Sequence, residues 1–382
     1  MSNNEVAQLF NMRSHNPSFF AVKDSVAFQG EELLDFCIPV NLHFPPVALV
    51  NMIRDQLNDI LRYYPDYADV HQQHIGEMTG LAPETIVPCN GSTEIITTLC
   101  QQARDPIVTS IPTFGRWTDL PEELHVPLYT ITRRRENNFR LEVDEIVRRV
   151  REVKAQTLVI SNPNNPTGAW LTLDEIKALT NVLEDLNTVI VDESFIDFSD
   201  LETAAAFAAD TPNLIVVKSM GKSIGWHGVR LGYAATGRGR AQVLRARLPF
   251  WNINGLAAFV LRNMTLFRSE YYESFLRVAA DRAYMTEQLS SVPGLRIYPS
   301  KANFLFVELP ERISGRTLRD RLLRNYGLMV RECSNKIGSS EQYLRLAVQG
   351  KAAVDSLAVA LRDELTHLQV SDSSFLVKGA GH

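Results

Sequence analysis

Lys222 lies in a turn rich in glycine and serine, directly after the apolar run 214–217. Gly221, Lys222 and Ser223 match the end of a phosphate-binding P-loop, in which a further glycine stands five residues before the Gly-Lys pair. That position holds Val216, inside the apolar run, so the sequence argues against a P-loop. An amine held between a buried strand and a tight turn is instead suited to act as a nucleophile.

Two other predicted strands end in residues that bind charged groups. Ser92 and Thr93 start a helical pattern directly after the first strand, where free backbone N–H groups attract anions. Asp192 follows the apolar run 188–191, and a carboxylate in this position needs a cationic partner or several hydrogen bonds. Taken singly, each motif also fits an ordinary helix N-cap.

A fourth strand leads into the loop 162–168, Asn-Pro-Asn-Asn-Pro-Thr-Gly, which is rigid because of its prolines and offers asparagine amides to a ligand oxygen. With Lys222 and Asp192 the motifs supply an anion site, an asparagine, an acid and a nucleophilic amine. Pyridoxal 5'-phosphate requires this combination, because its phosphate needs an anion site, its aldehyde an amine and its pyridine nitrogen a carboxylate. The residues therefore predict this cofactor and no metal.

Short apolar runs alternate with helical patterns from about residue 85, which predicts an α/β fold with a mostly parallel seven-stranded sheet covered by helices. The expected strands are 85–89, 107–111, 126–131, 157–161, 188–192, 214–219 and 231–236. After residue 255 the pattern changes to that of an α+β domain, with strands at 295–299, 303–309 and 343–348 and a final helix at 354–368. Because ligands of parallel sheets lie beyond the carboxyl ends of the strands, we expect the polar motifs to meet at one edge.

The changes of pattern also suggest domain boundaries. We expect an N-terminal arm at 1–47 that packs with the small domain, followed by a large cofactor-binding domain at 48–255. A small C-terminal domain is expected at 256–370. The remaining residues, 371–382, are polar and glycine-rich and are predicted to form a flexible tail.

Composition restricts the function classes. The chain has 382 residues, a net charge of -5 and a pI of about 6.0, without the basic bias that nucleic-acid binding requires. Its four cysteines are widely spaced, which predicts neither a zinc site nor a disulfide framework. The sequence carries no signal-peptide pattern and no long apolar segment, so we expect a cytoplasmic enzyme with a small-molecule partner and no membrane contact.

These motifs, in this order, resemble the class I and II aminotransferase superfamily of fold-type I pyridoxal-phosphate enzymes, and within it the histidinol-phosphate aminotransferases and threonine-phosphate decarboxylases. The resemblance covers about residues 33–368. It implies that Lys222 forms the Schiff base with the cofactor, that Asp192 pairs with the pyridine nitrogen and that Asn165 hydrogen-bonds the phenolic oxygen. It further implies that Phe114 stacks on the ring, and that the phosphate is held by Ser92, Thr93, Ser219 and Arg230.

The same resemblance assigns residues to the substrate and to a second subunit. Arg345, an arginine within the apolar run 343–348, matches the residue that grips the substrate carboxylate by a bidentate pair. Arg331 matches a second arginine near the site, although a salt bridge explains it equally well. Tyr64 matches the tyrosine that reaches the phosphate of the neighbouring subunit's cofactor, which implies a homodimer.

Several residues depart from the family pattern on the substrate side. Phe195 stands where aminotransferases usually have a tyrosine that hydrogen-bonds the phenolic oxygen, and phenylalanine here is typical of the threonine-phosphate decarboxylases. Pro39 replaces an asparagine in the N-terminal segment, and Trp226-His227 replaces a small residue or a proline pair. The same cofactor with a different substrate is indicated, and the candidates for shaping its pocket are His43, Trp117, His227, Trp251 and Asn254.

The leading hypothesis is an aminotransferase that acts at Cα of a small polar or phosphorylated amino acid or amine. The alternative is a lyase that decarboxylates an O-phosphorylated amino acid, or that catalyses elimination, replacement or cyclisation in a biosynthetic pathway. A non-catalytic regulator domain is disfavoured because Lys222 and Asp192 are both present. A Rossmann dehydrogenase is disfavoured because the segment 237–240 does not complete a GxGxxG motif.

Overall fold

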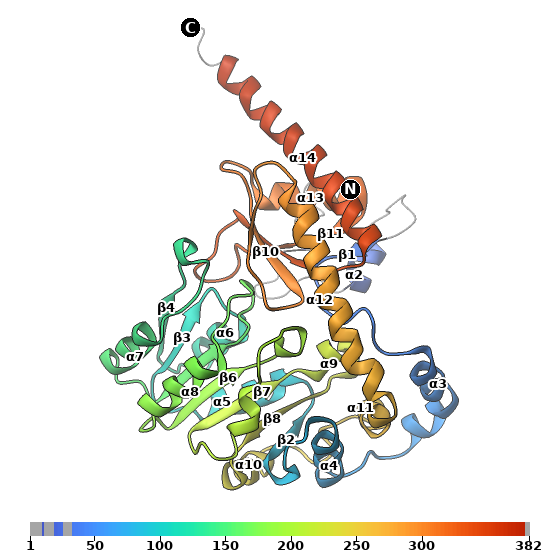
Figure 1. Cartoon of the computed structure of the whole chain (residues 1–382), viewed down its shortest axis with the longest axis vertical. Helices are drawn as coiled ribbons and strands as arrows, with labels where there is room; N and C mark the ends of the chain where they lie inside the picture. Colours follow the sequence, from blue (N-terminus) through green and yellow to red (C-terminus); the bar gives the residue numbers. More distant parts are fainter. Residues whose placement is uncertain (1–9, 11–18, 26–32, 379–382) are drawn as a thin grey trace. The chain divides into compact units, whose positions relative to one another are not determined.

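The computed structural model describes residues 10, 19–25 and 33–378, which form two compact units (Figure 1). The large unit contains Val40–Ala279 and Lys301–Asn303. The small unit contains the described residues up to Pro39, together with Ala280–Ser300 and the described residues from Phe304 onward. Among the described helices, none combines the length and the apolar character that a membrane span needs.

A seven-stranded sheet lies in the large unit. In spatial order, the described residues form β2 (Ile86–Cys89), β8 (Gly232–Thr236), β7 (Leu214–Lys218), β6 (Thr188–Asp192), β5 (Thr157–Ser161), β3 (Ile107–Ile111) and β4 (Leu128–Thr132). Neighbours from β7 to β4 are parallel, whereas β8 runs antiparallel to both β2 and β7. The predicted mostly parallel sheet is therefore confirmed, and every expected strand of this unit overlaps an observed one.

The two faces of the sheet are covered by different helices. Val189 and Val191 of β6 pack in a cluster with α4 (Ala68–Thr79), α7 (Val143–Glu152), α8 (Leu173–Val182) and α11 (Gly255–Asn263). Ile190 packs in the other cluster with α5 (Ser92–Gln102), α6 (Arg116–Glu123) and α10 (Arg238–Arg245). Since strand side chains alternate with a period of two, Asp192 follows Ile190 toward the face covered by α5 and α6.

Local sequence explains where several helices begin and end. Thr172 and Glu175 form a capping box before α8, with each side chain bound to the other residue's backbone N–H. In the small unit, the hydroxyl of Ser314 accepts the N–H of Thr317 at the start of α13 (Gly315–Tyr326). Gly327 ends that helix in the left-handed conformation, with φ of 66°, which glycine adopts without strain.

The division between the units falls at 39/40 and within α12 (Arg268–Ser290) at 279/280. Helix α11 packs on α3 (Val47–Arg62) and on α4, so residues beyond 255 still belong to the large unit. The domain boundaries expected at 47 and 255 correspond to changes in the sequence pattern and not to the division between the two units. Of the predicted N-terminal arm, residues 1–9, 11–18 and 26–32 lie outside the described part of the chain.

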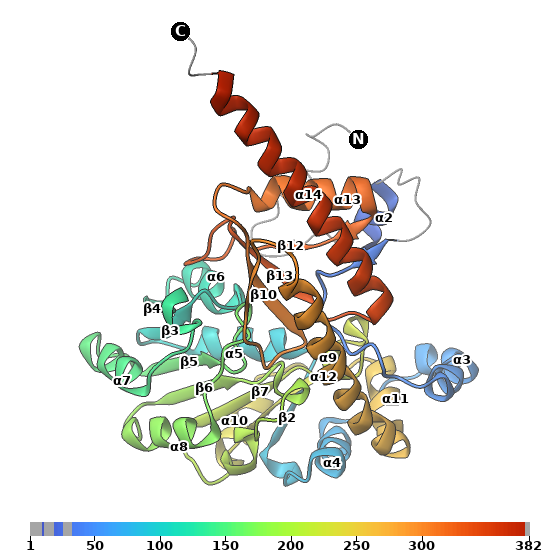
Figure 2. The same ribbon diagram turned by 45° about the horizontal axis from the view of Figure 1, so that its top comes forward.

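The described residues of the small unit form two sheets (Figure 2). The antiparallel sheet has the order β12 (Arg331–Glu332), β13 (Tyr343–Ala347), β10 (Phe304–Glu308) and β9 (Arg296–Tyr298). In the second sheet β1 (Leu34–Asp35) runs parallel to β11 (Leu328–Met329), and α2 (Phe19–Ser25) packs beside it through Val22. The α+β character is confirmed, but β1, β11 and β12 have two residues each and leave no periodic signal.

The final helix, α14 (Lys351–Lys378), packs on α13 and extends beyond its expected end at 368. Residues 371–378, expected as part of a flexible tail, are helical. The helix continues because 351–378 contains neither glycine nor proline, the residues that most strongly end helices. Residues 379–382 of the predicted tail lie outside the described part of the chain.

We predict that the cysteines of the folded protein do not react with thiol reagents. All four are buried free thiols, and burial raises the pKa of each, that of Cys100 to about 12. Because the thiolate is the reactive species, Ellman's reagent at mildly alkaline pH should label the native protein very slowly and the urea-unfolded protein rapidly. Fast labelling before unfolding would contradict the packing described for these residues.

Candidate active site

The carboxyl ends of β5, β6 and β7 bring three of the predicted motifs together. Ser161 of β5 is the register partner of Asp192 on β6, and Asp192 is the register partner of Val217 on β7. Neighbouring strands of a sheet lie about 4.8 Å apart. The loop 162–168, the Asp192 carboxylate and the turn that carries Lys222 therefore start side by side at one edge of the sheet.

Two asparagines fix the loop that follows β5. Asn162 donates through Nδ2 to the carbonyl of Leu171 at 3.1 Å and accepts the N–H of Leu171 at 2.8 Å. Asn164 donates through Nδ2 to the carbonyl of Pro112 at 3.1 Å. Both side chains are buried, so their amides hold the loop in place. Asn165, which the sequence assigns to the cofactor, is buried in the same loop.

Three donors hold the carboxylate of Asp192, a residue that is only 2% exposed. Ser194 donates its N–H at 3.0 Å and its hydroxyl at 2.6 Å to Oδ1, and the indole N–H of Trp117 donates to Oδ2 at 2.8 Å. A carboxylate has about four acceptor positions, so one position remains on Oδ2. Sequence reasoning named Trp117 as a pocket residue and missed this hydrogen bond.

The adjacent carboxylate, Glu193, belongs to a separate buried network. It accepts the N–H of Ala204 at 2.7 Å and the hydroxyl of Thr203. Burial raises its pKa, which the charge of nearby Lys218 partly offsets. Lys218 itself forms a 2.6 Å ion pair with Asp197. The consecutive acids at the end of β6 thus have different environments, and the donors that fix Asp192 do not reach Glu193.

The backbone around Lys222 is fixed by close contacts with the segment 41–44. Lys222 lies in α9 (Met220–Ser223), a single short helical turn. Asn41 donates its N–H to the carbonyl of Lys222 at 3.0 Å and its Nδ2–H to the carbonyl of Ser223 at 2.8 Å. Gly225 has φ of 74°, and a Cβ at this position would lie 2.0 Å from the carbonyl oxygen of Phe44. Only glycine permits this approach.

The Lys222 ammonium lies 4.8 Å from the centroid of the Phe195 ring. Phe195 is buried, and its ring replaces the phenol that aminotransferases usually present at this position. A cation–π contact with the ring face stabilises the protonated form of the side chain. Beneath the turn, the hydroxyl of Tyr271 donates to Oγ of Ser223 at 2.7 Å, which adds a further buried restraint.

An anion cradle lies where α5 begins. Ser92 is the first residue of this helix, whose initial N–H groups lack intrahelical partners. Gly91 has φ of 72°, and a Cβ there would lie 2.3 Å from Nη2 of Arg230, so this guanidinium covers the Gly91 backbone. A Cβ at Gly232 would lie 2.9 Å from the Ser92 nitrogen. Two glycines therefore allow the predicted phosphate residues Ser92, Thr93 and Arg230 to come together.

Phe114 and Ser219 complete the predicted set in the large unit. Phe114 is partly buried against the cluster of α5 and α6, and its carbonyl accepts the N–H of Trp117 at 2.9 Å. Ser219 is the N-cap residue of α9 and is 8% exposed. The residues assigned to the cofactor by sequence thus lie on the strand ends and turns at the carboxyl edge of β3, β5, β6 and β7, with the cradle at β2 and β8 beside them.

The two arginines assigned to the substrate lie in the small unit on neighbouring strands. Arg331 of β12 and Arg345 of β13 are register partners, so their side chains share one face of the sheet. Arg331 donates to Oδ1 of Asn335 at 2.9 Å, and Arg345 donates to the carbonyl of Cys37 at 2.5 Å. Both arginines are buried. Burial, followed by the charge of Arg331, lowers the pKa of Arg345 to about 10.

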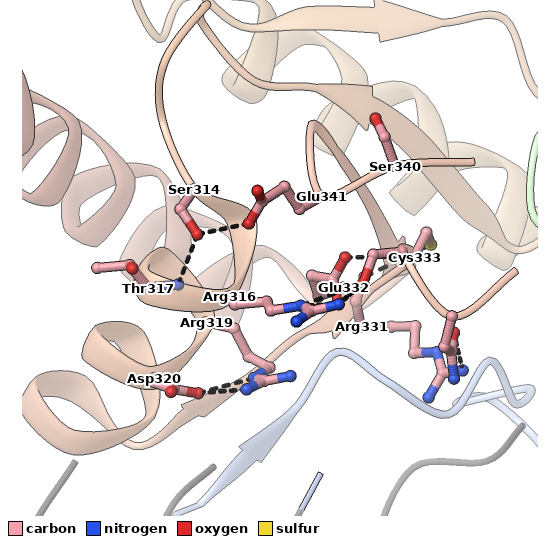
Figure 3. A network of polar contacts seen from close by, with 12 residues as sticks. Ser314, Arg316, Thr317, Arg319, Asp320, Arg331, Glu332, Cys333, Ser340 and Glu341 are labelled. Carbon is pink, nitrogen blue, oxygen red and sulfur yellow. Dashed lines mark hydrogen bonds and ion pairs between the residues drawn. The ribbon is translucent and has the colours of Figure 1, made fainter. Parts of the chain in front are cut away.

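A polar network holds the strand that carries Arg331 (Figure 3). Glu332 accepts the hydroxyl of Ser334 at 3.0 Å, and Arg316 donates through Nη2 to the same hydroxyl oxygen at 2.8 Å. Arg319 forms a 2.7 Å ion pair with Asp320. In this network Glu332 is thus paired with Arg316 and Asp320 with Arg319, while Glu341 accepts the hydroxyl of Ser314.

Tyr64 and two of the pocket candidates have clear contacts. Tyr64 is 81% exposed and stacks on Trp251, with ring centroids 4.6 Å apart. Asn254 caps α11, because its Oδ1 accepts the N–H of Ala257 at 2.9 Å and its Nδ2 donates to the carbonyl of Val229 at 2.9 Å. A structural role therefore accounts for Asn254.

Residues 31–361 match the family model described as aminotransferase class I and II. The chain belongs to this family. The match confirms the resemblance and the fold class that the sequence predicts. Members of the class I and II aminotransferases depend on pyridoxal 5'-phosphate, and one solved structure of this fold contains it. Within the chain, the glycine-lined cradle below Arg230 fits a phosphate, and the open acceptor position of Asp192 fits a pyridine N–H.

The relatives of this aminotransferase-family chain include decarboxylases. The L-serine phosphate decarboxylase of Sulfurospirillum multivorans is 30% identical over 93% of the chain and 94% of its own length. A solved decarboxylase structure from the same organism is 28% identical, covers 95% of the chain and 96% of its own chain, and has a TM-score of 0.87. Histidinol-phosphate aminotransferases are also among the relatives.

A longer relative is the CMP-5'-(3-aminopropyl)phosphonate synthase of Streptomyces rubellomurinus, which is 31% identical over 86% of the chain. The match covers 52% of that synthase, so the chain spans about half of its length. The chain also spans about half of the length of a second relative, the protein y4rO of Sinorhizobium fredii.

Replacing Gly225 by alanine is predicted to destabilise the protein and to disturb the turn that holds Lys222. The added Cβ meets the Phe44 carbonyl and φ is positive, so we expect the free energy of unfolding to fall by about 2 kcal/mol or more. Gly239→Ala is the matched control, because a Cβ there meets no heavy atom within 4 Å. Urea denaturation measures both changes, and equal stabilities of the two variants would contradict the close approach.

Proposed function

We propose that the chain is a pyridoxal-phosphate-dependent enzyme that decarboxylates a small amino acid carrying a phosphate ester or a phosphonate. The observation that carries this proposal is the pair of buried arginines, Arg331 and Arg345, directly opposite each other on β12 and β13. Like charges at opposed positions destabilise a sheet, so a substrate with two anionic groups gives a reason for their presence.

We assign the cofactor contacts as follows. Lys222 binds the cofactor aldehyde, Asp192 accepts the pyridine N–H on Oδ2, and Asn165 donates to the phenolic oxygen. Phe114 stacks on the ring. The phosphate contacts come from Ser92, Thr93, Ser219 and Arg230. When bound, the cofactor supplies an electron sink for the bond that breaks at Cα of the substrate. The Lys222 amine, on its fixed backbone turn, would be positioned to move a proton at Cα of the substrate.

Arg345 and Arg331 are assigned to the two anionic groups of the substrate. Arginine holds a carboxylate or a phosphate through two parallel N–H bonds, and each such bond is strong because both partners are charged. Burial increases the strength of these bonds, because the local dielectric constant is lower than in water. We assign the carboxylate to Arg345, as the resemblance implies, and the phosphate or phosphonate to Arg331.

Decarboxylation is favoured over other reactions at Cα by Phe195 and by the relatives. The bond that breaks is the one held perpendicular to the cofactor ring, so residues that orient the substrate decide the reaction. Phe195 is the residue typical of the threonine-phosphate decarboxylases at its position. The L-serine phosphate decarboxylase of Sulfurospirillum multivorans resembles the chain over almost the full length of both proteins.

Transamination of the same class of substrate is the second candidate. It is favoured by the family description and by the histidinol-phosphate aminotransferases among the relatives. The two reactions share the cofactor, Lys222 and the arginines, and they differ in whether the carboxylate or the hydrogen leaves Cα. The same assigned residues serve both reactions, so the products must be measured.

We further propose that the active form is a homodimer in which Tyr64 reaches the cofactor phosphate of the second subunit. Support comes from a group of exposed aromatic side chains around it: Tyr63, Tyr64, Tyr67, Phe250 and Trp251. An exposed apolar group of this kind is typical of an interface. A cytoplasmic location completes the proposal, and the free thiols at all four cysteines support it.

The reaction is tested with the reconstituted protein and O-phosphoserine. We expect release of carbon dioxide without any added 2-oxo acid, with the visible spectrum of the cofactor regenerated after each turnover. Conversion of the cofactor to its pyridoxamine form, together with consumption of a 2-oxo acid and no carbon dioxide, would support transamination instead. A chain that binds no pyridoxal 5'-phosphate on reconstitution would refute both candidates.

Arg331→Gln is predicted to separate function from stability. Loss of a charge-assisted bond to the substrate should lower kcat/KM for O-phosphoserine by roughly tenfold or more. The free energy of unfolding should stay within about 1 kcal/mol of that of the unsubstituted protein, because removing one of two opposed like charges relieves their repulsion. Arg316→Gln is the matched control, since Arg316 is exposed in the same network. Equal kinetics for the Arg331 variant and the unsubstituted protein would argue against the substrate assignment.

A further inference from the structure

We infer that Trp117 is a positioning residue for Asp192 and, through it, for the pyridine nitrogen of the cofactor. The inference rests on the proposed cofactor and adds a residue that the family resemblance does not supply. Its basis is the 2.8 Å hydrogen bond from the indole N–H of Trp117 to Oδ2 of Asp192. The residues lie 75 positions apart in the chain, and α6 and β6 bring them together.

The indole is held rigidly. Trp117 is 1% exposed and is the second residue of α6, where its N–H donates to the carbonyl of Phe114 at 2.9 Å. Its ring packs in the cluster that contains Val159 of β5 and Ile190 of β6. A side chain packed in this way occupies one rotamer, so the direction of its N–H is fixed. The turn that offers Phe114 to the face of the cofactor ring also directs the Trp117 donor at Asp192.

The donors on Asp192 have different origins. Both bonds to Oδ1 come from Ser194, two residues further along the chain, and form a local turn. The bond to Oδ2 comes from Trp117 on another element. Local bonds to Oδ1 alone leave the carboxylate free to tilt about that oxygen. With Oδ2 also held, the plane of the carboxylate is defined, and the remaining acceptor position on Oδ2 points in one direction.

The direction of that acceptor position matters for the electronics of the cofactor. With the cofactor bound, a carboxylate aligned with the pyridine N–H would keep this nitrogen protonated and the ring electron-poor. The visible absorbance of the bound cofactor would then change at a lower pH than with a misaligned carboxylate. Misalignment of Asp192 weakens the effect, so the pH midpoint of the cofactor's visible absorbance should rise. A loss of packing that leaves Asp192 aligned does not move this midpoint.

Two substitutions at Trp117 distinguish the effect of its N–H donor from the effect of the size of its side chain. Trp117→Phe removes the N–H and keeps an aromatic ring. Trp117→His removes the six-membered part of the indole, but its Nε2 lies close to the position of the indole nitrogen and can carry a proton to donate. Trp170→Phe is the matched control for loss of a tryptophan, because its ring contacts Arg140 and Lys301 and not Asp192.

Each apoprotein is titrated with pyridoxal 5'-phosphate, and the absorbance of the bound form is then followed against pH. We expect Trp117→Phe to weaken cofactor binding by roughly threefold to tenfold and to raise the absorbance midpoint, with Trp117→His recovering most of both effects. Trp170→Phe should change neither. Urea denaturation of every variant verifies that it is folded under the conditions of the titration.

The outcomes separate this inference from the proposed function. Equal affinity and midpoint for Trp117→Phe and the unsubstituted protein would overturn the positioning role while leaving the cofactor assignment intact. Equal losses in the Phe and His variants would also overturn it, because they would show that bulk and not the donor is required. Failure of the unsubstituted protein to bind pyridoxal 5'-phosphate would overturn the cofactor assignment together with the inference.

Discussion

The buried carboxylate of Asp192 is the constraint on which the large unit's site depends. A carboxylate that is 2% exposed must be satisfied by hydrogen bonds, and it obtains three of them from Ser194 and Trp117. Ser194 in the turn after β6 and Trp117 on α6 together meet this requirement. The parallel register then aligns the loop after β5 and the start of the Lys222 turn with the same edge.

Sequence reasoning succeeded where a local pattern reflects burial on both faces of the sheet. The runs that became β5 and β6 are apolar, rich in β-branched residues and bounded by polar turns, so both their position and their last residue were predictable. The motifs at their ends followed from the rule that parallel strands carry ligands at one edge. The polar composition of 371–382 predicts a tail, but α14 continues to Lys378 because 371–378 contains neither glycine nor proline.

Contacts between distant segments were beyond that reasoning. The indole of Trp117 reaches Asp192 across 75 positions, and its sequence context indicates only a buried aromatic residue. The opposition of Arg331 and Arg345 depends on β12, a strand of two residues that has no period to detect. Similarly, the carbonyl oxygen of Phe44 approaches Gly225 so closely that no side chain fits there. Nothing in the local sequence around either residue indicates this approach.

The residues around Lys222 indicate how the candidate cofactor site of the large unit can differ from that of other members of the family. Around Lys222 the contacts are backbone bonds, glycine approaches and buried amides, all of which tolerate little change. Phe195 is the exception, because its ring offers the amine a π face and offers the cofactor no hydroxyl donor. In the proposed function, the lack of a hydroxyl donor at Phe195 would make control of the ring electrons depend more on the pyridine nitrogen and hence on Asp192. The hydrogen bond from Trp117, whose ring is packed on another element, would then provide the additional support that Asp192 needs.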